Sequence, residues 1–367
     1  MRKPINPVVE KLKPSGIRKF FDLANTMQGV ISLGVGEPDF DTPWHICENA
    51  IHSMSTGKTH YTANRGLLEL RQAICEFHKV RYHQNYDPEK ETLVTVGGSE
   101  AIDLAMRALV TPGDEVIVLD PNYVAYAPTI ELAGGIPVPI ELKEEHEFKL
   151  MPDVLKHAIT DNTKAMIINY PSNPTGGVMT KEDYEKIVPI IKESGIYVIS
   201  DEIYAELSFD QDFASLAQFD EVKDQILVIN GFSKAFAMTG WRLGYVLSNA
   251  EISSAMTKIH QYVIMSAPTQ AQYAAIEALR HGLEDVLTMK KDYMNRRNLL
   301  VNRLNRMGLK TNMPHGTFYV FPNIQKTGLT SDEFCEKLLD EEKVACVPGN
   351  AFGEHGEGFI RISYAYS

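Results

Sequence analysis

The sequence predicts an α/β protein with a large domain, built on a mostly parallel sheet that helices cover on both faces, and a smaller α/β domain. Seven short apolar runs recur between residues 91 and 247, and helical patterns separate several of them. The chain has 367 residues, which is more than one compact core normally holds. These observations predict both the layered sheet and the second domain.

The seven apolar runs are expected to be strands buried on both faces, because they are nearly continuous in apolar residues and do not alternate with polar ones. Helices are expected after Gly98, where AIDLAMRALV precedes Thr-Pro-Gly, and after Thr180, where Glu182 and Asp183 suit a first helical turn. Strands and helices in series indicate a mostly parallel sheet. The runs comprise residues 92–96, 115–119, 136–140, 164–168, 196–200, 226–230 and 244–247.

The sequence changes in character on either side of these runs. Residues 269–306 are strongly helical, with no proline and one glycine, and predict a long helix that connects the two domains. A strand at 318–322, a helix at 331–343 and a strand at 359–363 are expected to form the small domain. We therefore predict an N-terminal arm with part of the small domain at 1–44, a large domain at 45–270, and the connecting helix with the small C-terminal domain at 271–367.

Composition argues against several classes of protein. With 48 acidic and 36 basic residues the formal net charge is −12, which disfavours a nucleic-acid binder. No apolar run approaches the roughly 20 residues of a membrane-spanning helix, and the N-terminus lacks the continuous apolar stretch of a secretory signal. Because the cysteines are widely spaced, with no CxxC pair and no nearby histidine at metal-ligand spacing, we expect isolated, reduced, buried thiols, no metal site and a cytoplasmic location. The cysteines are Cys47, Cys75, Cys335 and Cys346.

The most informative segment for chemistry is GFSKAFAMTGWRLGY, residues 231–245, which directly follows a predicted strand. Lys234 lies just beyond the strand among apolar residues, which disfavour the charged amine and make it a usable nucleophile. Lys234 is therefore a candidate Schiff-base lysine. A simply solvated lysine explains this segment equally well when it is considered alone.

Three other segments place polar residues where predicted strands end. Asp201 follows one strand at the edge where open α/β sheets bind ligands, and it suits either a cationic ring nitrogen or a helix cap. Gly97-Gly98-Ser99 precedes a helix and suits a phosphate, because glycines allow close approach and the helix start offers free amides. Asn173 precedes Pro174 and is held out of helical geometry, which also fits an ordinary turn.

Together these motifs resemble class I aminotransferases of fold type I, which depend on pyridoxal 5′-phosphate. Gly-Gly-Ser, Asn-Pro-Thr-Gly, Asp-Glu-Ile-Tyr, Ser-Lys and a late Arg-Ile-Ser occur in the family's order, and the likeness extends from SGIRKF to FIRIS. The resemblance implies a ping-pong transfer of an amino group from an L-amino acid to a 2-oxo acid, with pyridoxal 5′-phosphate as cofactor. It also implies a homodimer with a shared active site and no nucleic-acid or membrane partner.

The resemblance also implies a role for individual residues. Lys234 is similar to the lysine that holds the cofactor covalently, Asp201 to the partner of its ring nitrogen, and Tyr204 completes the implied catalytic set. Arg361 resembles the clamp for the substrate carboxylate, with Gly36 and Asn173 beside it. The remaining implied cofactor contacts are the phosphate cup of Gly97, Gly98, Ser99, Ser233 and Arg242, the ring-stacking Tyr123, the 3′-oxygen donors Asn173 and Tyr204, and Tyr61, which reaches the neighbouring subunit's phosphate.

The resemblance leaves the substrate open. Ser99 stands where one subgroup that includes bacterial aspartate aminotransferases has a lysine, and Pro14-Ser15-Gly16-Ile17 also lacks their polar residue, which weakens the case for aspartate. SGIRKF, YPSNPTG and MTGWR are more similar to PatA-like enzymes of Gram-positive bacteria, assigned to N-acetyl-L,L-diaminopimelate or named aromatic or general aminotransferases. Arg18 either faces a distal substrate carboxylate or is an ordinary surface arginine.

Two rival functions share the same residues. A carbon–sulfur β-lyase of this fold retains nearly every cofactor residue, whereas a non-catalytic regulatory protein on a degenerate fold is disfavoured by the intact catalytic set. Family members continue past the Arg-Ile-Ser strand into a closing amphipathic helix. This sequence stops at Ser367, so we expect the small domain to lack that helix.

Overall fold

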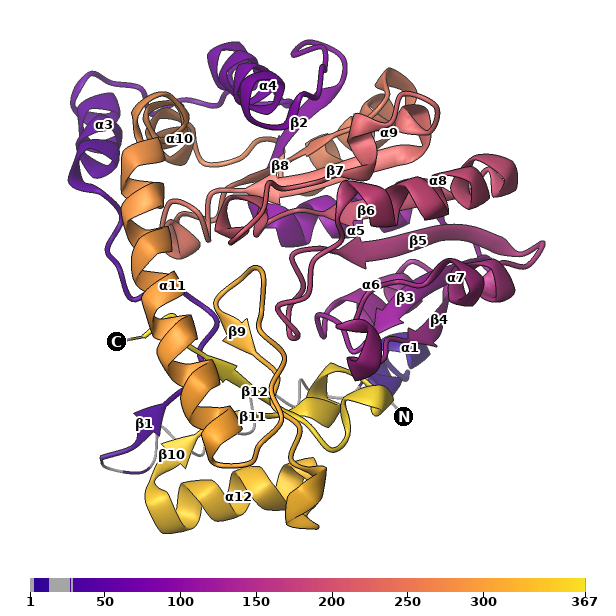
Figure 1. Ribbon diagram of the computed structural model, residues 1–367. Coiled ribbons are helices and arrows are strands. Elements are labelled where there is room, and N and C mark those ends of the chain that lie inside the picture. Colours follow the sequence, from indigo (N-terminus) through magenta and orange to yellow (C-terminus); the bar gives the residue numbers. More distant parts are fainter. Residues whose placement is uncertain (1–2, 13–26, 28, 367) are drawn as a thin grey trace.

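The computed structural model describes residues 3–12, 27 and 29–366. Its largest feature is a seven-stranded sheet in the order β2-β8-β7-β6-β5-β3-β4 (Figure 1). Only β8 runs antiparallel to its neighbours within this sheet, so the predicted mostly parallel sheet is confirmed. The strands are β2 (Thr92–Thr95), β3 (Glu115–Asp120), β4 (Ile136–Glu141), β5 (Thr163–Asn169), β6 (Tyr197–Asp201), β7 (Ile226–Gly231) and β8 (Gly244–Leu247).

Each predicted apolar run forms one of these strands, but burial on both faces is wrong for β4. This strand lies at the edge of the sheet, and Ile136 at its start is 50% exposed. The other strands bury alternate residues on opposite faces, so that Leu93 packs on one side and Val94 on the other.

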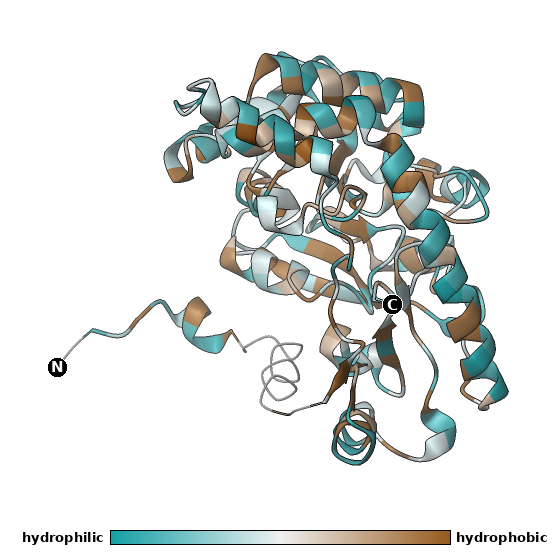
Figure 2. Cartoon of the chain, turned by 90° about the vertical axis from the view of Figure 1, so that its left-hand side faces the viewer, coloured by the Kyte–Doolittle hydropathy of each residue, from teal (hydrophilic) through white to brown (hydrophobic). Residues whose placement is uncertain are grey.

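Helices cover both faces of the sheet. One face is packed by α3 (Trp44–Ser55), α4 (Leu68–Tyr82), α7 (Pro152–Ala158), α8 (Lys181–Ser194) and α10 (Thr269–His281). The other is packed by α5 (Gly97–Leu109), α6 (Tyr126–Leu132) and α9 (Ala250–Val263). Figure 2 shows the apolar colour concentrated on the central strands and alternating with the polar colour along the helices, as expected for helices that bury one face.

The predicted long helix at 269–306 is two helices, and the single-helix prediction is wrong. Helix α10 ends at His281 and α11 (Leu283–Arg306) begins after Gly282. A Cβ on Gly282 would lie 3.1 Å from the ring of Phe236, so tight packing against another segment accompanies the break. The helix predicted after Thr180 forms as expected, with reciprocal hydrogen bonds between Thr180 and Asp183.

A second group of elements lies along α11 (Figure 1). It contains a three-stranded antiparallel sheet in the order β11-β12-β9 and a parallel pair of β1 with β10. The N-terminal part of the chain thus pairs with the C-terminal part, while the predicted domain boundaries stay a prediction. The elements of this group are β1 (Ile31–Ser32), β9 (Tyr319–Val320), α12 (Ser331–Glu342), β10 (Val344–Ala345), β11 (Val347–Pro348) and β12 (Ile360–Ser363). Helix α1 (Pro7–Lys11) lies apart from them and contacts α6 (Figure 1).

The cysteines differ from the isolated buried thiols that we expected. Cys335 and Cys346 are buried with their Sγ atoms 3.3 Å apart, because α12 packs on β10 and β11 and Cys346 lies between these two strands. Cys47 and Cys75 are only partly buried. The described residues include no helix that is long and apolar enough to cross a membrane, and no cluster of side chains suited to a metal ion.

Candidate active site

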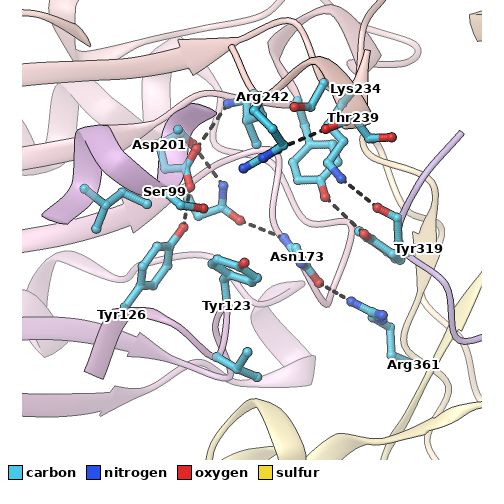
Figure 3. A pocket seen from close by; sticks show the side chains of 18 residues that line it. Ser99, Tyr123, Tyr126, Asn173, Asp201, Lys234, Thr239, Arg242, Tyr319 and Arg361 are labelled. Atoms are coloured by element: carbon cyan, nitrogen blue, oxygen red, sulfur yellow. Dashed lines mark hydrogen bonds between the residues drawn. The ribbon is translucent and has the colours of Figure 1, made fainter. Parts of the chain in front are cut away.

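A cavity of about 450 Å³ lies at the carboxyl ends of β5, β6 and β7 and extends to β9 and β12 (Figure 3). Residues at the ends of parallel strands meet at one edge of a sheet, which explains why distant segments converge here. The predicted site residues that line the cavity are Gly36, Gly98, Ser99, Tyr123, Asn173, Asp201, Tyr204, Ser233, Lys234, Arg242 and Arg361.

Lys234 lies in the loop that follows β7, with its amine in the cavity. Its Nζ donates a hydrogen bond to the carbonyl oxygen of Gly36 at 2.6 Å. Burial, followed by the positive charge of Arg361, lowers the pKa of Lys234 from 10.5 to about 8. The free amine is therefore accessible near neutral pH, as the apolar neighbours in the sequence predict.

Asp201 ends β6 on the floor of the cavity. Its Oδ2 accepts a hydrogen bond from the hydroxyl of Tyr126 at 2.7 Å, and its Oδ1 accepts one from the backbone of Ile203 at 3.3 Å. Burial raises the pKa of Asp201 from 3.8 to about 6, against the opposing effect of the Tyr126 hydrogen bond. A cationic group placed beside Asp201 would reverse this shift, so the carboxyl suits a positively charged partner.

The start of α5 and the segment before β8 form a cradle suited to an anion. Gly97 has a φ of +75°, and a Cβ there would lie 2.7 Å from the guanidinium of Arg242. A Cβ on Gly244 would lie 2.6 Å from the backbone nitrogen of Gly98. Backbone amides, the hydroxyls of Ser99 and Ser233 and the Arg242 guanidinium are the donors that a phosphate prefers.

The antiparallel direction of β8 explains how one loop supplies two of the cavity's cationic side chains. Residues 232–243 leave the carboxyl end of β7 and return at the amino end of β8, which lies at the same edge of the sheet. Lys234 and Arg242 therefore reach the cavity from a single short segment.

Arg361 projects from β12 at the opposite side of the cavity and is 3% exposed. It donates hydrogen bonds to Oδ1 of Asn173 at 2.9 Å and to the carbonyl oxygen of Gly34 at 2.7 Å, and its Nε has no hydrogen-bond partner among the described residues. The guanidinium lies 4.3 Å from the ring centre of Tyr319 and 4.7 Å from that of Phe352. A buried cation with only neutral hydrogen-bond partners is suited to an anionic ligand such as a carboxylate.

The structure adds lining residues that the sequence did not indicate. Tyr126 holds Asp201, the side chain of Asn169 bonds the backbone of Asp201 and Asn173, and the hydroxyl of Tyr319 lies 3.0 Å from that of Tyr204. Asn169 ends a predicted strand just as Asp201 does, so its position was a usable signal. The further lining residues that were not singled out are Ile102, Val124, Ile203 and Thr239.

Some predicted residues are not part of the cavity in this chain. Gly97 contacts Arg242 at its margin. Tyr61 lies between α3 and α4 and is 82% exposed, away from the cavity lining. Pro14-Ser15-Gly16-Ile17 and Arg18, on which the substrate argument partly depends, lie outside the described residues.

Curated relatives of this chain are aminotransferases by name. The chain is 51% identical over 367 residues to the putative aminotransferase YugH of Bacillus subtilis, covering 100% of this chain and 95% of the relative. It is 48% identical over 360 residues to an aspartate aminotransferase of Pyrococcus abyssi, covering 97% and 92%. It is also 42% identical over 367 residues to a probable N-acetyl-LL-diaminopimelate aminotransferase of Bacillus subtilis, covering 100% and 93%.

Solved structures agree with these relatives. A Pyrococcus protein named protein-A1 superposes with a TM-score of 0.96 at 47% identity, covering 98% of this chain and 94% of that one. The aromatic aminotransferase of Pyrococcus horikoshii gives a TM-score of 0.91 at 46% identity, covering 96% and 94%. The family model for aminotransferase class I and II matches residues 28–367. The chain therefore belongs to the class I and II aminotransferases and is an enzyme of that family.

Proposed function

We propose that this aminotransferase binds pyridoxal 5′-phosphate in the cavity and takes its amino group from a neutral or aromatic L-amino acid or from N-acetyl-L,L-diaminopimelate. The observation that supports the proposal is the convergence of Lys234, Asp201 and Arg361 on one cavity, with an amine of lowered pKa between a buried carboxyl and a buried guanidinium. Each group has a charge or proton state that suits one part of the cofactor or substrate.

The donors in the cavity fit the cofactor. The amides at the start of α5, with Ser99, Ser233 and Arg242, would hold its phosphate, and Asp201 would pair with its ring nitrogen. Tyr123 would contact the ring face, and the side chains of Asn173 and Tyr204, which also line the cavity, would contact the 3′-oxygen. When bound, the cofactor supplies an electron sink that delocalises negative charge from the substrate's α-carbon.

The protein contributes proton transfer and orientation. The Lys234 amine would accept the proton from the α-carbon of the donor amino acid. In the second half of the cycle it would donate a proton to the α-carbon of the amino acid that forms from the 2-oxo acid. Its pKa of about 8 suits this role near neutral pH. General acid–base help of this kind contributes ~10²–10⁴-fold. Arg361 orients the substrate through its α-carboxylate, since a guanidinium donates two parallel hydrogen bonds.

The charge of the cavity supports the neutral or aromatic donors of this proposal. Among the described lining residues the cations are Lys234, Arg242 and Arg361, and each has a role in the proposal. N-acetyl-L,L-diaminopimelate has a second carboxylate, as aspartate does, and its candidacy rests on the relative that is 42% identical. Aspartate remains the second candidate donor, because a relative that is 48% identical is named an aspartate aminotransferase.

A half-reaction screen tests the proposal. Purified holoenzyme is mixed with single amino acids, and the loss of the visible absorption of the bound cofactor is followed. Aromatic or neutral donors, or N-acetyl-L,L-diaminopimelate, should react faster than aspartate, and a faster reaction with aspartate would reverse the assignment. Pyruvate release from cystathionine without an added oxo acid would indicate a carbon–sulfur lyase, and a protein that shows no visible band would point to a non-catalytic role.

Replacing Arg361 with lysine is expected to raise the KM for the amino acid about 10- to 100-fold, with a smaller change in kcat. Lysine keeps the charge but loses one of the paired hydrogen bonds to the carboxylate. Steady-state kinetics measure the effect. Arg81→Lys is the matched control, because Arg81 makes a two-point contact with Glu206 outside the cavity. An equal rise in KM for both variants would contradict the proposal that Arg361 binds the substrate carboxylate.

We also propose that the enzyme is a homodimer in which Tyr61 serves the partner's cofactor. Tyr61 and Tyr262 are 82% and 86% exposed, and their segments adjoin through a hydrogen bond from Asn64 to the carbonyl of Met265. Such exposed apolar side chains suit a subunit contact.

Tyr61→Phe is expected to weaken pyridoxal 5′-phosphate binding at least about tenfold, because a hydrogen bond to a charged group is lost. Tyr262→Phe should leave the affinity unchanged, since it removes an exposed hydroxyl of the same face. Cofactor titration of the two variants gives the comparison. Equal affinities in both variants would exclude the role of Tyr61 at the phosphate.

A further inference from the structure

We propose that Tyr319 is a positioning residue for the amino-group transfer, in which its hydroxyl orients the hydroxyl of Tyr204 and its ring supports the guanidinium of Arg361. The inference rests on the proposed function, because it concerns the groups that would hold the cofactor's 3′-oxygen and the substrate carboxylate. Tyr319 lies on β9 and contacts both Tyr204 and Arg361; Figure 3 shows it near Arg361 in the cavity.

The hydroxyl of Tyr319 lies next to that of Tyr204, which would donate a hydrogen bond to the cofactor's 3′-oxygen. Its oxygen lies 3.0 Å from that of Tyr204, and the two side chains are 1% and 3% exposed. A hydroxyl has a single proton, so if Tyr204 donates to the 3′-oxygen, the hydrogen bond between the tyrosines must be donated by Tyr319. Donation to Tyr204 polarises its O–H bond and makes it a stronger donor.

The N-terminal arm confines the Tyr319 hydroxyl to this position. A Cβ on Gly36 would lie 2.4 Å from that oxygen, so the hydroxyl packs directly on the glycine. The carbonyl of the same glycine accepts the hydrogen bond of Lys234. The arm thus contacts both Lys234 and Tyr319, and the Tyr319 hydroxyl is held between the arm and Tyr204.

The ring of Tyr319 contributes separately through Arg361. The guanidinium carbon lies 4.3 Å from the ring centre, within the range of a cation–π contact. Strand β9 pairs with β12 so that Tyr319 is opposite Ser363, two residues from Arg361, which places the ring beside the guanidinium. The ring and the hydroxyl therefore serve different groups and are separable by substitution.

The hydroxyl is tested by Tyr319→Phe holoenzyme, in which the visible absorption of the bound cofactor is titrated against pH. Losing the donation to Tyr204 weakens the stabilisation of a charged 3′-oxygen, so the pKa of the absorbing group should rise by about 0.3 unit. Tyr293→Phe is the matched control, because the Tyr293 hydroxyl is buried with no hydrogen-bond partner in the part of the chain that the structure describes, and its ring lies 5.6 Å from that of Phe318 in the same cluster. No shift for Tyr319→Phe, or an equal shift for Tyr293→Phe, overturns the role of the hydroxyl.

The ring is tested by the KM for the amino acid. Tyr319→Phe keeps the ring and should leave KM within about twofold, whereas Tyr319→Leu should raise it about tenfold through the lost cation–π contact. Equal KM values for the two variants overturn the role of the ring. If the leucine variant fails to fold, a raised KM in Tyr319→Phe still contradicts the proposed role of the ring, because that variant retains the ring. A wild-type protein that shows no cofactor band refutes the proposed function itself, whereas active wild-type enzyme with an unshifted Tyr319→Phe variant refutes this inference alone.

Discussion

Replacing Lys234 with alanine is expected to lower kcat for amino-group transfer at least about 10⁴-fold. Lys234 is the only lysine among the described residues that line the cavity, and its pKa of about 8 makes the free amine available near neutral pH. The variant loses both the covalent attachment of the cofactor and the base that moves the proton. Single-turnover absorbance with the preferred amino acid measures the effect.

Binding of the cofactor should survive in the Lys234→Ala variant, because the cradle around Gly97 and Arg242 is unaltered. Equilibrium dialysis separates this outcome from a collapsed site. Lys290→Ala is the matched control, since burial also lowers the pKa of Lys290 but that lysine lies outside the cavity. Activity of the Lys234 variant within tenfold of wild type would exclude the lysine from the mechanism.

Asp201→Asn is expected to lower kcat about 10³-fold while making the cofactor-free protein more stable. The activity falls because a neutral amide no longer holds the positive charge on the ring nitrogen, a loss that falls within the 2–5 kcal/mol range for truncating a buried charge pair. The opposite effect on stability follows from burial of the carboxylate, which raises the pKa of Asp201 from 3.8 to about 6.

The sign of the pH dependence is fixed by this upward shift. The folded chain binds the Asp201 proton more tightly than the unfolded chain, so stability falls as the pH rises from about 4 to about 6. Above that window the ionised carboxylate costs up to about 3 kcal/mol, which the asparagine variant avoids. Urea unfolding of the cofactor-free proteins should therefore show a stabilised variant at pH 8 and no difference near pH 3.

Glu202→Gln provides the control for Asp201→Asn. Glu202 is the next residue, it is buried, and burial raises its pKa to about 7, but it does not line the cavity. This variant should share the gain in stability without the large loss of activity. If both variants lost activity equally, general disturbance of the strand end would explain the result better than a contact with the cofactor.

The strands were predictable from sequence because burial demands continuous apolar runs, and this requirement is local. The edge position of β4 had a sequence signal in Pro137 and Pro139, because proline has no backbone N–H to donate and is found within sheets mainly on edge strands. The break at Gly282 had a weaker signal. A single glycine is tolerated within a helix, and here tight packing against Phe236 accompanies the break.

The site was predictable where its chemistry follows strand ends, as for Asp201 and the segment that carries Lys234. Tyr126 and Tyr319 gave no comparable signal, because a tyrosine in an apolar segment is most often a core residue. Their importance arises from contacts with Asp201 and Tyr204, which lie far away in sequence. Only the folded arrangement brings these hydroxyls together.

The reversed direction of β8 has a consequence for how the enzyme tolerates changes in length. Residues 232–243 are anchored in the sheet at both ends and carry both Lys234 and Arg242, whereas Asp201 comes from a different strand. An insertion or deletion in this loop would displace the amine of Lys234 and the guanidinium of Arg242, while the carboxyl of Asp201 would keep its place at the end of β6. The number of residues in this loop is therefore a functional requirement. We expect variants with a longer or shorter loop to lose activity even when every side chain of the site is retained.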